Sequence, residues 1–337
     1  MRLFCQVISC GAISLLLSAV AAAQAPSARA LNTLDQQTAA LDRVHAVVVA
    51  HQGRIVHERH QGGPGVSAPT NIKSLSKTVL AAVTGAAIEA GVIESTEQTM
   101  VALLGQLPNG VDPQVNEITV AHLLAQQAGL ERTSGSNYSA WVASNNWVNN
   151  ALSRPFVDEP GGRMLYSTGT SHLLSAALTQ ASGDTTHALA QRLLGEPLNI
   201  AIPPWLQDPQ GIYFGGNDMQ LSPRALIEIG ELYRNDGMVF DDSGEGQRVL
   251  PEGWVEDSWT ARGESQWTGD GYGFGWFITT LADVPVYYGR GYGGQALYVI
   301  PEREMTVVMT SDPTPPSPGG QFQQRLNQLL IGLLEGE

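Results

Sequence analysis

The segment from residue 71 to residue 91 constrains the fold most, because an apolar helical pattern there begins with two reactive polar side chains. Leu80, Val83 and Ala87 recur at intervals of three or four residues, and Gly91 ends the pattern. This spacing predicts an apolar helix around which the rest of the chain is organised.

Ser74 and Lys77 lie three residues apart at the start of this helix, so their side chains share one face. A serine hydroxyl is a poor nucleophile near neutral pH and needs a neighbouring base. The unpaired N–H groups and positive dipole end of a helix N-terminus also suit a developing oxyanion. The pair therefore predicts a nucleophile and its base. The alternative is an ordinary helix start, with Ser74 as its cap and Lys77 in solvent.

The scarcity of lysine in the chain favours the interpretation of Ser74 and Lys77 as a nucleophile and its base. Lys73 and Lys77 are the only lysines among the 18 lysines and arginines of the chain. Arginine keeps its proton in a protein, whereas a buried lysine can become a neutral base. The residue three before Lys73 is Thr70, so we assign the role of base to Lys77.

The first 23 residues have the pattern of a secretory signal peptide, with cleavage between Ala23 and Gln24. A basic start is followed by an apolar run that ends in small residues. Both cysteines, Cys5 and Cys10, fall in this segment, so residues 24–337 form no disulfide. We expect an exported bacterial protein, periplasmic or secreted.

Charge and hydropathy limit the possible partners. The formal net charge of -14 disfavours nucleic acid and anionic membrane surfaces. No later stretch approaches the roughly 18 apolar residues that a membrane span needs. We expect a small-molecule or short peptide-like substrate, without nucleic acid and without an integral membrane segment after cleavage.

The remaining patterns predict strands at both ends of the chain and helices between them. Strands are expected at residues 44–50 and 54–59, and again at 273–279, 284–289, 296–300 and 305–310. Residues 92–230 are mostly helical with Gly, Pro and Asn breaks, including a short helix at 118–129 capped by Thr119. A last amphipathic helix at 321–334 is expected to cover the sheet.

Two groups of side chains allow more than one interpretation. Tyr138, Trp141 and Trp147 stand in a polar loop at 131–150, where they either line a pocket or pack beneath the loop. Four histidines cluster at residues 45–60, but no zinc-binding spacing accompanies them, and we expect no metal and no other cofactor.

Two further motifs lie after the Ser74 helix. Tyr166-Ser-Thr168 forms a turn before a helix that begins near Thr170, where the tyrosine hydroxyl can project into a cleft and relay a proton. Residues 290–295, Arg-Gly-Tyr-Gly-Gly-Gln, place glycines at a strand end. Such glycines allow a backbone N–H to approach a ligand closely, or merely permit a tight hairpin.

Together, the three motifs resemble the serine hydrolase superfamily of class C β-lactamases, penicillin-binding D-alanyl peptidases and related esterases and amidases. The similarity spans nearly all of residues 24–337 and is strongest to the 6-aminohexanoate-dimer hydrolase and family VIII esterase branch. It implies an α/β (α+β) fold of the β-lactamase/transpeptidase type. A sheet lobe would comprise about 27–70 and 235–337, and a helical lobe about 71–234, with the site in the cleft between them.

The resemblance also implies roles for individual residues. Ser74 would attack an ester or amide carbonyl, and Lys77 and Tyr166 would act as base and proton relay. The backbone N–H groups of Ser74 and Tyr292 would form the oxyanion hole. The other predicted substrate contacts are Gly293, Thr168, Tyr138 and Trp141.

The motifs depart from β-lactamases at two positions. Thr168 stands where those enzymes carry an asparagine, and Arg290 stands in place of the lysine of Lys-Thr-Gly. Both differences favour an esterase or amidase. A peptidoglycan D-alanyl peptidase or weak β-lactamase is the alternative within the enzyme class, and a catalytically silent penicillin-binding-like scaffold is the alternative of another class.

Overall fold

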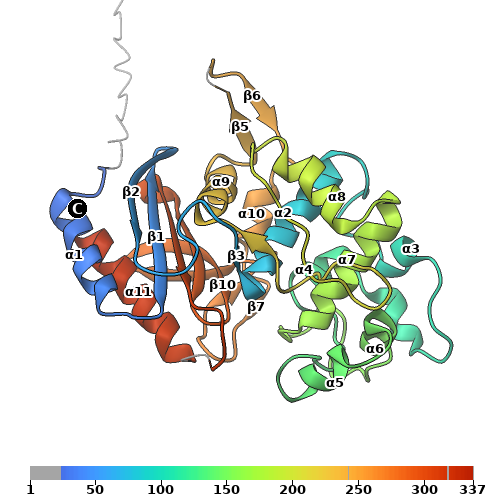
Figure 1. The fold of residues 1–337 in the computed structure, drawn as a ribbon. Coiled ribbons are helices and arrows are strands. Elements are labelled where there is room, and N and C mark those ends of the chain that lie inside the picture. The colour runs from blue at the N-terminus through green and yellow to red at the C-terminus, as the bar shows by residue number, and fades with distance from the viewer. Residues whose placement is uncertain (1–23, 242, 317–318, 337) are drawn as a thin grey trace, which may run out of the picture.

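The computed structural model describes residues 24–241, 243–316 and 319–336. The predicted signal peptide, residues 1–23, lies outside the described residues. An antiparallel sheet of eight strands forms one side of the molecule, and a group of helices forms the other (Figure 1). This is the mixed α/β, β-lactamase/transpeptidase-like fold that the sequence predicted.

The sheet has the strand order β2-β1-β12-β11-β10-β9-β8-β7, so β1, from early in the chain, and β12, from its last part, are neighbours. β1 pairs antiparallel with both β2 and β12. The strands are β1 (Val44–His51), β2 (Arg54–His60), β7 (Gly263–Glu264), β8 (Gly271–Tyr272), β9 (Phe277–Leu281), β10 (Val284–Gly291), β11 (Gln295–Ile300) and β12 (Met305–Ser311).

Helices cover both faces of this sheet, which explains why its central strands are apolar on both sides. Val47 and Val49 of β1 pack with α1 (Ala28–Ala39) and α11 (Gly320–Glu335), which lie side by side on the outer face (Figure 1). The alternate residues, Val48 and Ala50, belong to the core that includes α2 (Ser76–Glu89) and α9 (Pro223–Arg234).

The helical side is built from short elements around α2 (Ser76–Glu89) and α7 (Thr168–Ser182). The other helices are α3 (Met100–Leu104), α4 (Val120–Leu124), α5 (Tyr138–Val142), α6 (Trp147–Leu152), α8 (Thr186–Ala190) and α10 (Trp254–Ser258). Single turns are η1 (Lys73–Leu75), η2 (Pro113–Glu117), η3 (Gly135–Asn137), η4 (Gln191–Gly195) and η5 (Pro301–Arg303). Two small hairpins pair β3 (Thr70–Asn71) with β4 (Gln220–Leu221), and β5 (Met238–Phe240) with β6 (Gly246–Arg248).

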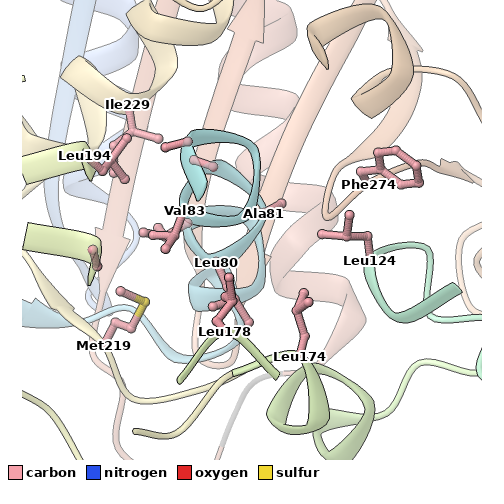
Figure 2. Close-up of a cluster of buried hydrophobic side chains, with 14 of the residues drawn as sticks. Leu80, Ala81, Val83, Leu124, Leu174, Leu178, Leu194, Met219, Ile229 and Phe274 are labelled. Carbon is pink, nitrogen blue, oxygen red and sulfur yellow. The ribbon is translucent and has the colours of Figure 1, made fainter. Parts of the chain in front are cut away.

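Helix α2 runs through the centre of the molecule between the sheet and the other helices. Figure 2 shows Leu80 and Val83 of α2 enclosed by side chains from several elements, among them Leu178 of α7, Ile229 of α9 and Phe274. Twelve of its fourteen residues are buried, which is the enclosure that an apolar helix requires. The start of this helix is therefore held rigidly.

The structure corrects three predicted elements. The strand expected at 273–279 begins only at Phe277, as β9, because Gly275 has a φ of 78° and turns the chain between β8 and β9. The helix capped by Thr119 ends at Leu124, and Gln126 beyond it has a φ of 60°. Helix α9 packs on strands β1, β11 and β12, although it precedes residue 235, where the sheet lobe was expected to resume.

Candidate active site

Ser74 lies in the single turn η1, immediately before α2 begins at Ser76. Lys73 has a φ of 51°, and its backbone N–H donates to Asn71 Oδ1 at 2.9 Å, which fixes the entry into the turn. The Ser74 hydroxyl does not cap the helix. The serine is therefore not the ordinary N-cap of the alternative interpretation, and its half-buried side chain is directed to other partners.

Lys77 is only 4% exposed, which excludes the solvated lysine of the alternative interpretation. Its Nζ lies 3.3 Å from Ser74 Oγ, 2.7 Å from the carbonyl oxygen of Gly216 and 3.5 Å from Thr168 Oγ1. Burial lowers the pKa of Lys77 from its usual value to about 7. A lysine with this pKa is substantially neutral at physiological pH and can accept a proton from the serine.

Tyr166 completes a group of three side chains at Ser74. Its side chain is hydrogen-bonded to that of Ser74, and Lys77 Nζ lies 4.7 Å from the centre of its ring. Burial raises the pKa of Tyr166, although the Ser74 hydrogen bond and the positive charge of Arg290 oppose that rise. The tyrosine is therefore protonated at neutral pH and can donate its proton.

The turn that carries Tyr166 is held by polar side chains from the preceding loop. Gln126 Oε1 accepts from the backbone N–H of Ser167 at 2.8 Å, and Ser134 Oγ accepts from that of Thr168 at 2.9 Å. Ser134 Oγ also lies 3.1 Å from Thr168 Oγ1, so the hydroxyl that faces Lys77 has a second partner. Helix α7 begins at Thr168, two residues earlier than predicted.

Strand β10 brings residues 290–294 against the Ser74 turn. A Cβ atom on Gly291 would lie 2.2 Å from the carbonyl oxygen of Ile72, and one on Gly289 would lie 2.3 Å from Thr78 Oγ1. Two glycines are therefore required for the strand to approach this closely, and a tight hairpin alone does not explain them.

Gly291→Ala is expected to destabilise the protein by about 1–3 kcal/mol, because the added methyl group meets a backbone carbonyl that cannot rotate away. Thermal or denaturant unfolding would measure the change. Gly332→Ala in α11 is the matched control, since its methyl group would meet only Gln37 Oε1 at 3.5 Å. Equal stability of the two variants would contradict the close approach of β10.

A cavity of about 330 Å³ opens beside Ser74. Tyr166, Trp267, Arg290, Tyr292 and Gly293 are among the residues that line it. Trp267 is 57% exposed at this cavity, with its ring edge-on to that of Tyr166. A substrate that enters the cavity meets the serine, the tyrosine and the glycine-rich strand end together.

The structure separates three of the predicted substrate contacts, Trp141, Tyr138 and Thr168, from the lining of this cavity. Thr168 is buried, and its Oγ1 lies 3.5 Å from Lys77 Nζ. Trp141 is fully buried, and its Nε1 donates to the carbonyl oxygen of Trp147, so it packs beneath the loop and the expectation of a substrate contact was wrong. Tyr138 is half-buried, its hydroxyl accepts from Asn217 Nδ2 at 3.1 Å, and it is not among the residues that line the cavity.

Sequence reasoning missed Gln126, Ser134, Gly216 and Trp267. The pair Gly215-Gly216 was the one available signal, since adjacent glycines mark close backbone approach. In the part of the chain that the structure describes, no three His, Asp or Glu side chains converge as a metal site would require. Within the histidine cluster, His57 instead pairs with Asp35 at 2.9 Å.

A serine beside a buried lysine of low pKa, with a tyrosine hydrogen-bonded to that serine, defines a serine hydrolase site of the β-lactamase and transpeptidase class. The chain belongs to the beta-lactamase family, which matches residues 38–330. This confirms the resemblance inferred from the three motifs.

Several solved structures share the fold at low sequence identity. A candidate 6-aminohexanoate-dimer hydrolase from Bacillus anthracis is 21% identical, with a TM-score of 0.70 over 88% of this chain and 80% of that one. EstCE1, a hydrolase with promiscuous acyltransferase activity, is 17% identical, with a TM-score of 0.69 over 90% and 98% of the two chains. A D-stereospecific amidohydrolase from Streptomyces sp. is 17% identical, with a TM-score of 0.67 over 91% and 99%.

The search of curated proteins returned no match to this sequence. None of the helices among the described residues has both the length and the hydropathy that crossing a membrane would take.

Proposed function

We propose that this protein hydrolyses an ester or amide bond through an acyl-enzyme on Ser74. The observation that carries the proposal is Lys77, a buried amine with a pKa of about 7 whose Nζ lies 3.3 Å from Ser74 Oγ. Few structural roles call for a lysine in such a position, because burying its charge is unfavourable and no carboxylate among the described residues pairs with it.

In the proposed reaction, neutral Lys77 takes the Ser74 proton as Oγ attacks the substrate carbonyl. The backbone N–H groups of Ser74 and Tyr292 stabilise the oxyanion that forms. Tyr166 gives its proton to the leaving alcohol or amine, which departs, and is reprotonated from Lys77. Water then attacks the acyl-enzyme with the same residues as base and acid, releasing the carboxylic acid and the free serine.

The substrate class follows from the cavity beside the serine. Its lining combines the exposed ring of Trp267 with the glycine-rich strand end. Outside this lining, the buried Thr168 stands where a β-lactamase would carry an amide side chain. The hydrolase and amidohydrolase names of the solved relatives support an ester or amide of a small molecule. We further propose that the protein is exported, on the strength of the leader pattern in residues 1–23.

One observation favours the alternative of a D-alanyl peptidase or weak β-lactamase. Arg290 lines the cavity and lies 4.3 Å from the ring centre of Phe277, and no carboxylate among the described residues forms an ion pair with it. A substrate carboxylate placed there would have a cationic partner.

Intact-protein mass spectrometry after incubation with a fluorophosphonate and, separately, with a penicillin distinguishes these functions. We expect a fluorophosphonate adduct and no stable penicillin adduct, because the cavity lacks the asparagine and lysine of a β-lactam site. A penicillin adduct would establish the peptidase or β-lactamase alternative. No adduct with either reagent would contradict the proposed chemistry and leave a silent scaffold.

A further inference from the structure

A buried histidine–aspartate pair near Lys77 takes no part in the proposed reaction. His172 of α7 and Asp208 are both completely buried side chains, with His172 Nε2 3.0 Å from Asp208 Oδ2. The rings of Trp147 and Phe214 pack around the histidine at 5.3 and 5.9 Å. A pocket lined by such rings would hold a large apolar side chain equally well, so packing alone does not explain a polar pair there.

The hydrogen bonds around this pair define which histidine nitrogen carries the proton. The backbone N–H of Gly215 points at His172 Nδ1 at 3.4 Å, and a backbone N–H can only donate. His172 Nδ1 must therefore be the unprotonated nitrogen, and the proton lies on Nε2, facing Asp208.

Asp208 is positioned to accept a hydrogen bond from the Nε2–H group of His172. Its other oxygen, Oδ1, accepts from the backbone N–H groups of Gln210 and Ile212 at 2.8 and 2.9 Å. Burial favours the neutral carboxyl, but the hydrogen bond from His172 and those from the backbone outweigh it and lower the pKa of Asp208. The carboxylate is thus ionised and fixes the orientation of the imidazole.

The backbone that His172 contacts at Gly215 continues directly into the carbonyl group that contacts Lys77. Gly216 supplies the carbonyl oxygen that lies 2.7 Å from Lys77 Nζ, the shortest of the three polar contacts of that amine. A Cβ atom on Gly215 would lie 2.2 Å from the carbonyl oxygen of Ser171, so only glycine fits against α7 here. Two adjacent glycines are conformationally free, and their orientation needs an external anchor.

The orientation of this carbonyl matters for the chemistry of a neutral amine. Neutral lysine has two N–H bonds and one lone pair. If the two N–H bonds are directed to Gly216 O and Thr168 Oγ1, the lone pair is left facing Ser74 Oγ at 3.3 Å. The Gly216 carbonyl therefore determines whether the lone pair or an N–H bond faces the nucleophile.

We propose that His172 and Asp208 are positioning residues that direct the lone pair of Lys77 toward Ser74, by anchoring the backbone at Gly215, one residue before the carbonyl of Gly216. This inference rests on the proposed function in assigning Lys77 as the base. In a serine protease, a buried carboxylate fixes the tautomer of the catalytic histidine. Asp208 fixes the tautomer of His172 in the same way, but His172 then orients the backbone and does not itself take the serine proton.

Asp208→Asn tests the proposal with little change in shape. The asparagine Oδ1 can still accept from both backbone N–H groups, while its NH₂ replaces the oxygen that faced His172. The imidazole must then accept at Nε2 and carry its proton on Nδ1, where it opposes the N–H of Gly215. We expect the rate of Ser74 labelling by a fluorophosphonate to fall about 10- to 100-fold, with little change in reversible affinity for the reagent.

Two nuclear magnetic resonance readouts separate this effect from a general loss of structure. Nitrogen-15 shifts of the histidines should place the His172 proton on Nε2 in the wild type and on Nδ1 in Asp208→Asn. Because the chain has only two lysines, Nζ-labelled lysine should report the titration of Lys77 individually, and its pKa should differ between the two proteins. Asp184→Asn is the matched control, since it removes an exposed carboxylate paired with Arg192 and should label as the wild type does.

The outcomes are distinguishable. A wild-type His172 protonated on Nδ1, or an Asp208→Asn variant with the altered tautomer and an unchanged labelling rate, would overturn the inference. If Asp208→Asn does not fold, His172→Gln replaces it. Its amide NH₂ can still donate to Asp208, but glutamine has no acceptor atom bonded to Cγ, where His172 Nδ1 faces Gly215. Unchanged labelling in that variant would overturn the inference equally. A wild type that does not react with the fluorophosphonate would instead refute the proposed function, and the tautomer and lysine measurements would still test the geometry.

Discussion

Ser74→Ala is expected to abolish the fluorophosphonate adduct and to lower turnover of an ester substrate by about 10⁴- to 10⁶-fold, the range seen when a serine nucleophile is removed. Activity is expected to be lost because the Ser74 hydroxyl is the group that both Lys77 and Tyr166 contact. The residual rate would come from the oxyanion donors and from binding. Intact mass and steady-state kinetics measure the two effects independently.

Ser76→Ala is the matched control for this prediction. Ser76 also lies in the Ser-Leu-Ser-Lys motif, but its hydroxyl donates to the carbonyl oxygen of Lys73 at 2.5 Å and accepts from the N–H of Met219 at 3.1 Å. Its loss should lower stability by about 1–2 kcal/mol and leave the adduct at Ser74. An adduct that persists in Ser74→Ala and disappears in Ser76→Ala would move the nucleophile to the second serine.

The nucleophile and its base could be predicted from the sequence because they are local. Ser74 and Lys77 are three residues apart on one helical segment, and helical geometry alone brings such side chains together. The partner that orients Lys77 could not be found in this way. Gly216 is 139 residues further along the chain and contributes a backbone carbonyl, which carries no side-chain signal.

The strands show the same distinction between local pattern and long-range context. Those predicted at 44–50, 284–289 and 305–310 begin at the residues where β1, β10 and β12 begin, because β-branched runs between turns specify them. The family resemblance implied only that the strands at 44–59 and those after 271 share one sheet lobe. The pairing of β1 with β12 within it was not predicted, because it joins segments far apart in the sequence.

The aromatic loop shows why burial could not be predicted from composition. The segment 131–150 is rich in Ser and Asn, which is typical of an exposed loop. It forms the short helices α5 and α6, and Trp141 turns inward because Trp147 offers a carbonyl oxygen to its N–H. A tryptophan whose N–H is satisfied inside the protein can be buried completely.

Lys77→Arg is expected to lower the rate of Ser74 labelling by at least about 10²- to 10⁴-fold, the contribution of a general base. Arginine keeps the positive charge but cannot give up its proton at any pH at which the protein is folded. Arginine is also longer than lysine, and Lys77 Nζ already lies 2.7 Å from the carbonyl oxygen of Gly216. Labelling rates measured from pH 5 to pH 9 would show the loss.

The pH dependence gives this prediction its sharpest form. The reactive species is the neutral amine, whose fraction rises with pH, so the wild-type labelling rate should increase about tenfold per pH unit below about 7 and reach a plateau above it. Lysine resonances supply the control, because the chain has only two lysines and the resonance that disappears in Lys77→Arg belongs to Lys77. A wild-type rate that falls as pH rises through 7, or an Lys77→Arg variant with the wild-type profile, would show that the lysine is not the base.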